Sequence, residues 1–269
     1  MEQEKRSVSD MRLKTVVKAN ELIQKSRFNL SLQQQKIVLY LISQITPYDE
    51  DFKTYQFSIS EFCRVCGIDE TSGKNYQDLK TAIKDIADKS LWVEVEEGRE
   101  TLLRWIAKPY INKKSGTIEI SLDSDMKPFL LQLKQNFTKY ELLWTLSFKS
   151  KYSTRLYELI KSVHFHELET YERTFSLDEL RRMLGAEKYT TYQTFKTRVL
   201  NPAVAEINAY SDKVVSYEPI KQGRAVAKIR FSIGTKDTLE RLKLQSDIEH
   251  ELGLDQLTLW DTMDEKGFL

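Results

Sequence analysis

Apolar residues recur at helical spacing in two stretches of the chain that lie 116 to 118 residues apart. Each stretch has one run with steps of three and four residues: Tyr76, Leu79, Ile83 and Ala87 in the first, and Tyr192, Phe195, Val199 and Ala203 in the second. Such spacing places each set on one face of a helix. The pattern therefore predicts two equivalent amphipathic helices and an internal repeat.

A short capped helix is predicted before each of these helices. Residues 57–62 (Phe-Ser-Ile-Ser-Glu-Phe), closed by Gly67, recur as residues 175–180 (Phe-Ser-Leu-Asp-Glu-Leu), closed by Gly185. Ser60 and Ser176 are the expected N-caps, and Ser176 with Glu179 fits a capping box. The glycines favour helix ends.

The flanking segments complete the same order in both halves. Residues 31–42 and 147–160 predict a preceding helix, whereas residues 91–106 and 214–231 alternate like β-hairpins with turns at 97–98 and 222–223. Helix, capped helix, helix and hairpin is the order of a winged helix-turn-helix. We expect an α+β fold made of a tandem pair of winged helix-turn-helix domains. A single α+β domain with accidental similarity is the alternative.

These elements suggest how the chain is divided. We expect a flexible N-terminus (1–13), a first winged helix (14–122), a helical connector (123–143), a second winged helix (144–235) and an acidic helical tail (236–269). The connector should contain a helix over 125–133, and the tail should begin as an amphipathic helix. The connector lacks a low-complexity linker, so the domains should be held in a defined relation.

Composition is consistent with two domains in a cytoplasmic protein. An apolar content of 41% over 269 residues allows two cores, and no run approaches the roughly 18 apolar residues of a membrane span. Two cysteines three positions apart cannot staple such a fold.

Charge is unevenly divided along the chain. Residues 144–235 carry fifteen Lys and Arg against ten Asp and Glu, a net of +5, whereas residues 236–269 carry four against nine, a net of −5. The total of +1 therefore conceals a basic second half, which suits a polyanionic partner.

Three segments of the second half resemble a known family. Residues 146–160, 175–185 and 192–208 are similar to the second winged helix of theta-type plasmid replication initiators that bind iterons, and residues 17–23 and 31–36 resemble the opening of their first domain. The resemblance implies a protein that binds short direct repeats in double-stranded DNA at a plasmid origin and assists opening of the duplex. It also implies recruitment of host replication initiator and helicase-loading proteins, and a homodimer that represses its own promoter.

A winged helix lays its second helix in the major groove, while its wing and helix ends contact phosphates. With the apolar face inward, the second copy directs Thr190, Thr194, Thr197, Arg198 and Asn201 outward. The first copy directs Lys74, Asp78, Thr81 and Asp85 outward, and its carboxylates would repel DNA. Base reading is therefore assigned to residues 144–235, and the first domain to dimerisation and auxiliary DNA contact.

Basic residues near the helix starts, turns and wings complete the expected interface. The further candidates are Lys74, Lys80, Lys149, Lys151, Arg155, Lys188, Lys196, Lys221 and Arg224. Each could instead be an ordinary solvated charge, but seven of the nine cluster in the basic residues 144–235.

Three motifs suggest enzymatic or metal chemistry, and each fails a test of spacing or context. His164 and His166 resemble the metal-binding pair of nicking initiators, but they end a predicted helix where that pair lies on a strand. Cys63 and Cys66 lack a second zinc-binding pair. Residues 67–74 resemble a P-loop with one residue too many. We therefore expect no catalytic residue, metal or cofactor.

Two other functions remain open. A transcriptional regulator can use the same fold, and a metal-dependent nicking initiator is a remote alternative.

Overall fold

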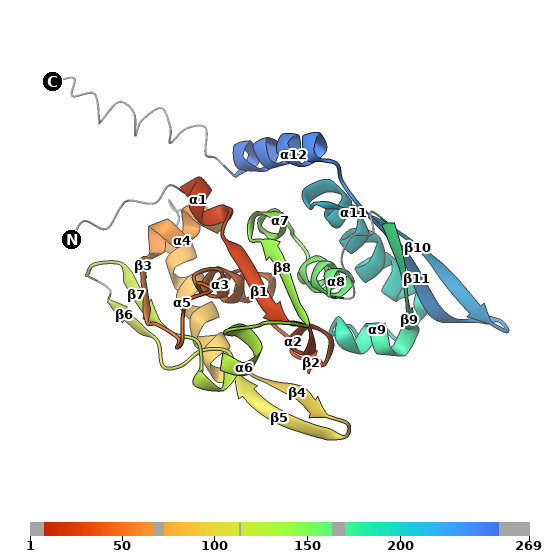
Figure 1. The fold of residues 1–269 in the computed structure, drawn as a ribbon, viewed down its shortest axis with the longest axis horizontal. Helices are drawn as coiled ribbons and strands as arrows, with labels where there is room; N and C mark the ends of the chain where they lie inside the picture. Colours follow the sequence, from red (N-terminus) through yellow and green to blue (C-terminus); the bar gives the residue numbers. More distant parts are fainter. Residues whose placement is uncertain (1–7, 67–72, 113, 163–169, 253–269) are drawn as a thin grey trace.

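The computed structural model of the chain describes residues 8–66, 73–112, 114–162 and 170–252 (Figure 1). For residues 73–76 it describes the helical backbone only. No helix in these described parts is both long and apolar enough to cross a bilayer.

The first copy of the repeat has the expected order of elements. It contains α3 (Leu32–Ser43), β3 (Tyr55–Ser58), α4 (Ile59–Cys66), α5 (Gly73–Asp88) and a hairpin of β4 (Ser90–Glu96) and β5 (Arg99–Arg104). The second copy contains α8 (Lys151–Lys161), β9 (Thr170–Ser176), α9 (Leu177–Met183), α10 (Tyr192–Phe195), η2 (Lys196–Leu200), α11 (Asn201–Tyr210) and a hairpin of β10 (Lys213–Gln222) and β11 (Ala225–Thr235).

The two copies pair their strands differently. In the second copy β9 joins the hairpin in one antiparallel sheet, ordered β10-β11-β9. In the first copy β3 instead pairs with β7 (Thr117–Ile120), which also pairs with β6 (Tyr110–Asn112), while β2 (Ser26–Arg27) extends the hairpin. The strands β6 and β7 were not expected from the repeat. Burial of Ile118 and Ile120 on one face of β7 explains why it pairs with β3 over the core.

The segment expected to be a helical connector is only partly helical. It contains η1 (Ser124–Met126), α6 (Lys127–Leu130) and then a strand, β8 (Phe137–Glu141). This strand pairs antiparallel with β1 (Thr15–Ala19), and α7 (Leu143–Leu146) follows it. The expected helix over 125–133 therefore ends early, because the chain must turn to reach β1.

The N-terminus also differs from expectation. Residues 8–12, expected to be flexible, form α1 (Val8–Arg12), in which Met11 and Arg12 are buried. A second short helix, α2 (Asn20–Gln24), follows β1.

One helix cap is also not where the sequence analysis put it. In the first copy Ser58, and not Ser60, caps α4, because the Glu61 amide donates to Ser58 Oγ at 2.9 Å. In the second copy the Glu179 amide donates to the expected cap, Ser176, at 3.2 Å. Ser58 is the true counterpart of Ser176, 118 positions earlier in the chain.

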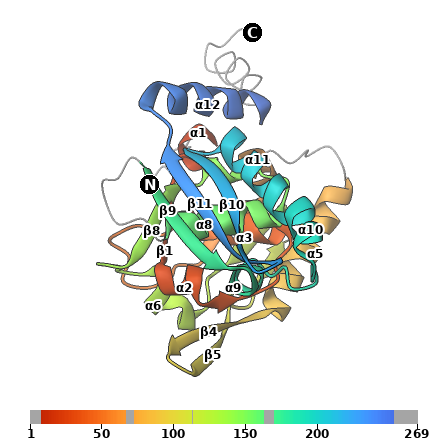
Figure 2. The ribbon, with the colours of Figure 1, turned by 90° about the vertical axis from the view of Figure 1, so that its right-hand side faces the viewer.

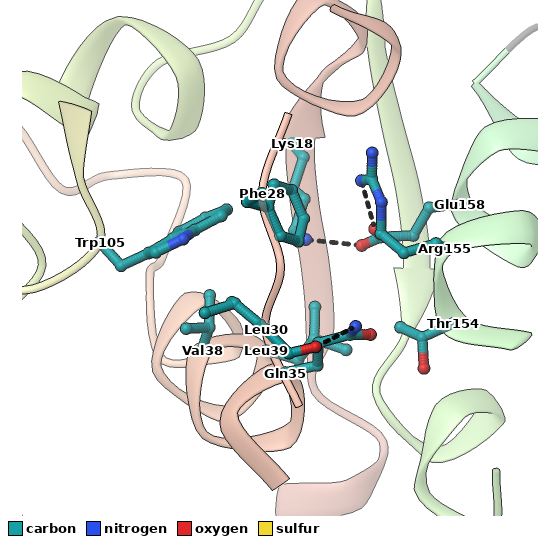
Figure 3. Close-up of a pocket in the computed structure, with 10 residues that line it drawn as sticks. All are labelled: Lys18, Phe28, Leu30, Gln35, Val38, Leu39, Trp105, Thr154, Arg155 and Glu158. Carbon is teal, nitrogen blue, oxygen red and sulfur yellow. Dashed lines mark hydrogen bonds and ion pairs between the residues drawn. The ribbon is translucent and has the colours of Figure 1, made fainter. Parts of the chain in front are cut away.

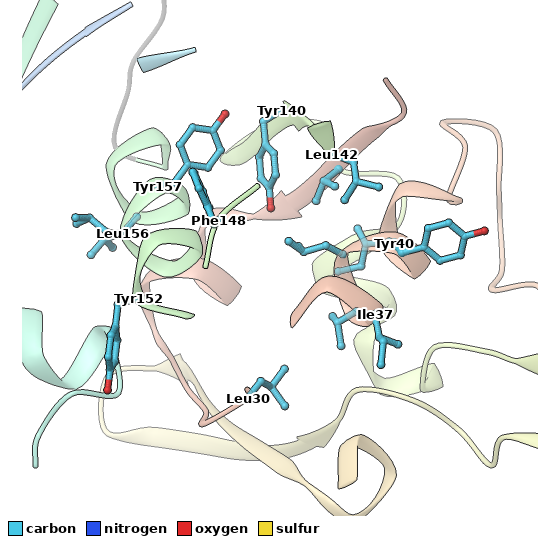
Figure 4. Close-up of a cluster of buried hydrophobic side chains, with 14 of the residues drawn as sticks. Leu30, Ile37, Tyr40, Tyr140, Leu142, Phe148, Tyr152, Leu156 and Tyr157 are labelled. Carbon is cyan, nitrogen blue, oxygen red and sulfur yellow. The ribbon is translucent and has the colours of Figure 1, made fainter. Parts of the chain in front are cut away.

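Helix α8 lies at the centre of the molecule, between the two halves (Figure 1). Residues 152–160 are all buried, including the polar ones. Tyr157 packs edge-on against Tyr140 of β8, with ring centroids 5.3 Å apart, and its hydroxyl donates to Asp212 at 2.7 Å. The side chains in Figure 4 belong to one apolar cluster that runs from α3 through β8 to α8. The two copies therefore share a continuous core.

A buried ionic cluster joins α8 to β1 and β8 (Figure 3). Lys18 Nζ of β1 lies 2.6 Å from Glu158 Oε1, and the side chains are 4% and 1% exposed. The Tyr140 hydroxyl donates to the same oxygen at 2.5 Å, and Arg155 Nη1 lies 3.6 Å from Glu158 Oε2. Burial by itself raises the pKa of Glu158, but Lys18, Arg155 and these hydrogen bonds hold it below its ordinary value. Glu158 is thus a buried carboxylate that depends on cations from its surroundings.

Replacing Glu158 with glutamine should destabilise the fold by about 3 kcal/mol, because Lys18 and Arg155 would stay buried without a counter-charge. The lowered pKa adds a pH dependence. The native carboxylate stabilises the fold above its unfolded pKa of about 4.3, and this contribution is lost as pH falls further. Glu158→Gln should lack this dependence.

Urea unfolding from pH 3.5 to 7 measures both effects. The control is Lys84→Gln, which breaks the exposed Lys84–Asp88 pair (2.7 Å) and should leave the free energy of unfolding almost unchanged, because solvent screens this pair. Equal losses for the two variants would contradict a structural role for the buried cluster.

Candidate nucleic-acid interface

The second-domain helix from α10 to α11 has the inward face that its spacing predicts. Phe195, Val199 and Ala203 are fully buried, and Tyr192 is half-buried. The Thr191 hydroxyl caps the start by accepting from the Thr194 amide at 3.2 Å.

The opposite face of this helix is polar and open to solvent. All five residues expected there are exposed: Thr190, Thr194, Thr197, Arg198 and Asn201. Two of them already have local partners, since Thr194 donates to Thr191 O at 3.0 Å and Asn201 accepts from the Tyr217 hydroxyl at 2.6 Å. Thr197 and Arg198 are the more available pair. Gln193 is exposed beside them and was missed, although its type suits adenine recognition.

A wide turn interrupts the helix where proline predicts a kink or a break. Pro202 has no N–H and would clash with the carbonyl four residues earlier in a regular α-helix. Here η2 is a π-helical turn, in which the Asn201 amide donates to Lys196 O, five residues back. The interruption is therefore absorbed within one turn, and that turn carries Thr197 and Arg198.

The second wing is a long hairpin that ends in a glycine turn (Figure 2). Its turn lies at Gly223 and Arg224, one residue later than expected, because Gln222 pairs with Ala225. Gly223 has a φ of +64°, which favours glycine. Lys221 and Arg224 are exposed at this tip, and so is Lys228 on β11, which was not among the expected residues.

A group of lysines lies between the start of α8, the segment before α10 and the end of α5. Lys151, at the start of α8, donates to Asn29 Oδ1 at 2.6 Å. Burial lowers its pKa, and the nearby Lys188 and Lys89 lower it further. Lys188 is exposed and Lys89 is half-buried. Lys89 was missed because it follows α5 in sequence and approaches Lys151 only in the folded chain.

Two other expected cations flank this group. Lys149 is exposed before α8, where its backbone amide donates to Glu206 at 3.1 Å. Lys196 is half-buried at the margin of the apolar face. Both side chains remain candidates for phosphate contacts.

Among the expected contacts whose side chains the structure describes, Arg155 is the one that it contradicts. Its side chain is buried at 5% exposure. Its Nη2 donates to Ile23 O at 3.1 Å and to Met183 O at 3.0 Å, and the guanidinium lies 4.3 Å from the Phe28 ring centroid. Position along α8 suggested a surface cation, but α8 is covered from both sides. Arg155 connects the two halves and is not available to a phosphate.

The first-domain helix α5 presents a mixed surface. Asp78, Lys80 and Thr81 are exposed, while Asp85 accepts from Gln34 at 3.1 Å. The side chain of Lys74 lies outside the described residues. Figure 2 places α5 and α10 on the same side of the molecule. The two helices can therefore approach one extended ligand together.

The motifs that suggested other chemistry can be placed in part. Cys63 and Cys66 are both buried, and burial raises the pKa of Cys66 to about 12. A thiol with so high a pKa stays protonated near neutral pH, so it is a poor metal ligand. Among the described residues, no three His, Cys, Asp or Glu side chains gather as metal ligands. His164, His166 and most of the P-loop-like segment lie outside the described residues.

Comparison with known proteins gives two matching sequence families. Residues 15–161 match the family described as initiator replication protein, WH1, and residues 176–233 match initiator Rep protein, WH2. The expected pair of winged-helix domains is confirmed. The WH1 match includes α8, which the repeat had suggested as the opening of the second domain.

Two curated proteins and one solved structure are also similar. A replication initiation protein of Escherichia coli is 27% identical over 252 residues, covering 91% of this chain and 75% of that protein. The PI protein of Escherichia coli is 28% identical over 153 residues, about half of each chain. The crystal structure of the Pi initiator protein in complex with iteron DNA has a TM-score of 0.71 at 20% identity, covering 84% of this chain and 99% of that one. This last likeness is one of fold.

Two substitutions should separate base reading from phosphate contact. Arg198→Ala should relax preference at one or two base positions, since one Arg–guanine contact is worth roughly 1 to 3 kcal/mol of discrimination. Arg224→Ala should weaken binding to all duplexes alike and lower the salt slope by about one. The measurement is titration of a selected duplex and its scrambled version at several salt concentrations.

The matched control is Arg99→Ala at the tip of the first wing, where Arg99 lies 3.4 Å from Glu96. It should change neither property, because an acidic neighbour already pairs with the arginine. If Thr81→Ala relaxes base preference and Arg198→Ala does not, reading belongs to the first domain.

Proposed function

Since the chain belongs to the family of initiator replication proteins with WH1 and WH2 domains, we propose that it initiates plasmid replication by binding iterons in duplex DNA. The observation that carries this proposal is the exposed polar face of α10 and η2, together with Lys89 of the first domain, which lies near Lys151 and Lys188. A helix with this surface fits the major groove, and flanking lysines fit phosphates. The iteron complex of the similar Pi initiator supports the choice of ligand.

We propose that the two domains divide the work. The second domain reads bases through Thr197 and Arg198, supported by the net charge of +5 over residues 144–235. The first domain makes an auxiliary contact, because its wing carries Glu94, Glu96, Glu97 and Glu100. Four carboxylates on one hairpin disfavour close approach to a phosphate backbone.

We further propose that the protein opens the origin, recruits host replication initiator and helicase-loading proteins, and represses its own promoter as a homodimer. These steps rest on the sequence resemblance to theta-type initiators. The proposed activity requires no catalytic residue, metal or cofactor. We place the protein in the cytoplasm, where plasmid DNA is replicated.

A plasmid-maintenance assay tests the initiator function against its alternatives. A plasmid that lacks its own initiator but carries this gene with its flanking direct repeats should replicate, and Arg198→Ala should abolish maintenance. Repeat binding should be equal in EDTA and in magnesium, without strand cleavage. Promoter repression without plasmid maintenance would point to a transcriptional regulator. A metal-dependent nick that His164→Ala removes would point to a nicking enzyme.

Dimerisation has a candidate surface on the first wing. Trp92 and Leu102 face each other across β4 and β5 and are 47% and 50% exposed. Trp105, the second tryptophan of residues 91–106, is instead buried beside Phe28 at a centroid distance of 5.0 Å. Leu102 lies on β5, which is an edge strand, and Trp92 lies on the neighbouring β4. Apolar side chains beside an open edge favour association with a second chain.

Trp92→Ser should therefore weaken self-association by about 2 kcal/mol, as loss of an aromatic anchor commonly does. Analytical ultracentrifugation of the full chain measures this change. The control is Tyr48→Ser, since Tyr48 is 92% exposed and lies away from this hairpin in sequence. An unchanged dissociation constant for Trp92→Ser would place the dimer contact elsewhere.

A further inference from the structure

The C-terminal helix α12 (Thr238–Glu251) begins on the second domain. Just before it, the Lys236 amide donates to Asp212 O at 3.0 Å, and Lys236 Nζ donates to Ser211 O at 2.8 Å. Asp237 and Glu240 then form a capping box, with bonds of 2.8 and 3.1 Å. The start of α12 is thus fixed to the end of α11, in a part of the chain that neither family match covers.

The other end of α12 lies on the first domain (Figures 1 and 2). Ile248 is buried at 1% exposure, and Ser9 of α1 donates to Glu249 Oε1 at 2.7 Å. The amphipathic pattern expected for this helix is only partly realised, because Leu239 and Leu242 are 79% and 59% exposed. The helix is about 20 Å long. It packs against the protein mainly through its last turns, because Leu239 and Leu242 near its start are exposed.

Arg12 joins this end of α12 to the body of the first domain. Its Nε donates to Val65 O at 2.9 Å, and its Nη2 donates to Arg64 O at 2.6 Å and to Leu252 O at 3.3 Å. These carbonyls lie at the C-terminal ends of α4 and α12, where helix dipoles favour a cation. Burial lowers the pKa of Arg12 to about 10, while nearby Glu249 opposes that change. One guanidinium thus donates to the last carbonyls of both α4 and α12, which lie far apart in the sequence.

We infer that α12 is a strap that holds the two winged helices in one relative orientation and so sets the spacing of α5 and α10 on DNA. It returns from the end of the second domain to α1, which contacts α4, the helix that precedes α5. Arg155 and Tyr157 of α8 contact Met183 and Asp212 of the second domain, and α12 joins the domains a second time through α1. A rigid pair of binding helices gains affinity for a site whose two parts are correctly spaced, and it loses affinity when that spacing changes.

The inference rests on the proposed DNA-binding function for its consequence, but the strap itself can be tested without DNA. The variant is the full-length chain with Ile248→Ser and Glu249→Ala. These substitutions remove the apolar packing of Ile248 and the hydrogen bond from Ser9 to Glu249, and they keep the tail. The matched control is Leu239→Ser, an exposed position on the same helix. Hydrogen exchange of α1 amides should rise in the variant and stay unchanged in the control.

The second measurement is binding to the native repeat and to repeats with one inserted base pair between the parts that the two domains cover. The native chain should bind the repeat with the inserted base pair much more weakly than it binds the native repeat. The strap variant should bind the native repeat about tenfold more weakly and lose less on insertion, because its domains can adjust.

Exchange of α1 that is the same in variant and native chain would overturn the strap, whatever the DNA result. Raised exchange with unchanged affinity and an unchanged insertion penalty would overturn its role in spacing. Failure of the native chain to bind any repeat would instead contradict the proposed function and leave the exchange result as the test of the strap.

Discussion

The Glu158 carboxylate is the point on which the packing of α8 against β1 and β8 depends. A buried carboxylate costs several kcal/mol unless cations and donors surround it. Its partners come from separate elements: Lys18 from β1, Tyr140 from β8 and Arg155 from α8 itself. Arg155 also reaches carbonyls of α2 and α9. The carboxylate can be satisfied only when β1, β8 and α8 are correctly packed, and the Arg155 contact with α9 then favours one placement of the second domain on α8.

This placement has a direct consequence for the candidate interface. Because α8 is shared, the lysines at its start lie close to cations of both domains, and Lys89, Lys151 and Lys188 form one positive region. Mutual repulsion among these lysines raises the free energy of the protein when no ligand is bound. A phosphate backbone would relieve that repulsion, so a region of this kind favours a polyanion more than separate surface charges would.

The two copies show how one scaffold can carry different surfaces. Both use a serine-capped helix, an apolar-faced second helix and a hairpin. The second wing ends in Lys221 and Arg224, however, while the first ends among glutamates and exposes Trp92 and Leu102. The inward residues are similar because both cores need the same packing. The outward residues differ because no packing constrains them, which leaves each surface free to serve a separate partner.

The repeat, the order of elements and the outward face of the second helix could all be deduced from the chain alone. These features depend on local periodicity, capping and turn chemistry, which act over a few residues. The Ser60 cap was an error of two positions at this same level. Exposure of Thr197 and Arg198 could likewise be deduced from helical spacing, because their neighbours Phe195 and Val199 had to face inward.

Only the tertiary structure decided what depends on contacts between distant segments. Position on α8 suggested that Arg155 was a surface cation, but burial of that helix from both sides turned it into a structural link. Lys89 lies near Lys151 and Lys188, although it is far from them in sequence. Strand β7 pairs with β3. The end of α12 contacts Arg12, which is 240 positions away. Such contacts leave no periodic signal in the sequence, because the free energy of burying a charge or an apolar face is set by whichever segment finally covers it.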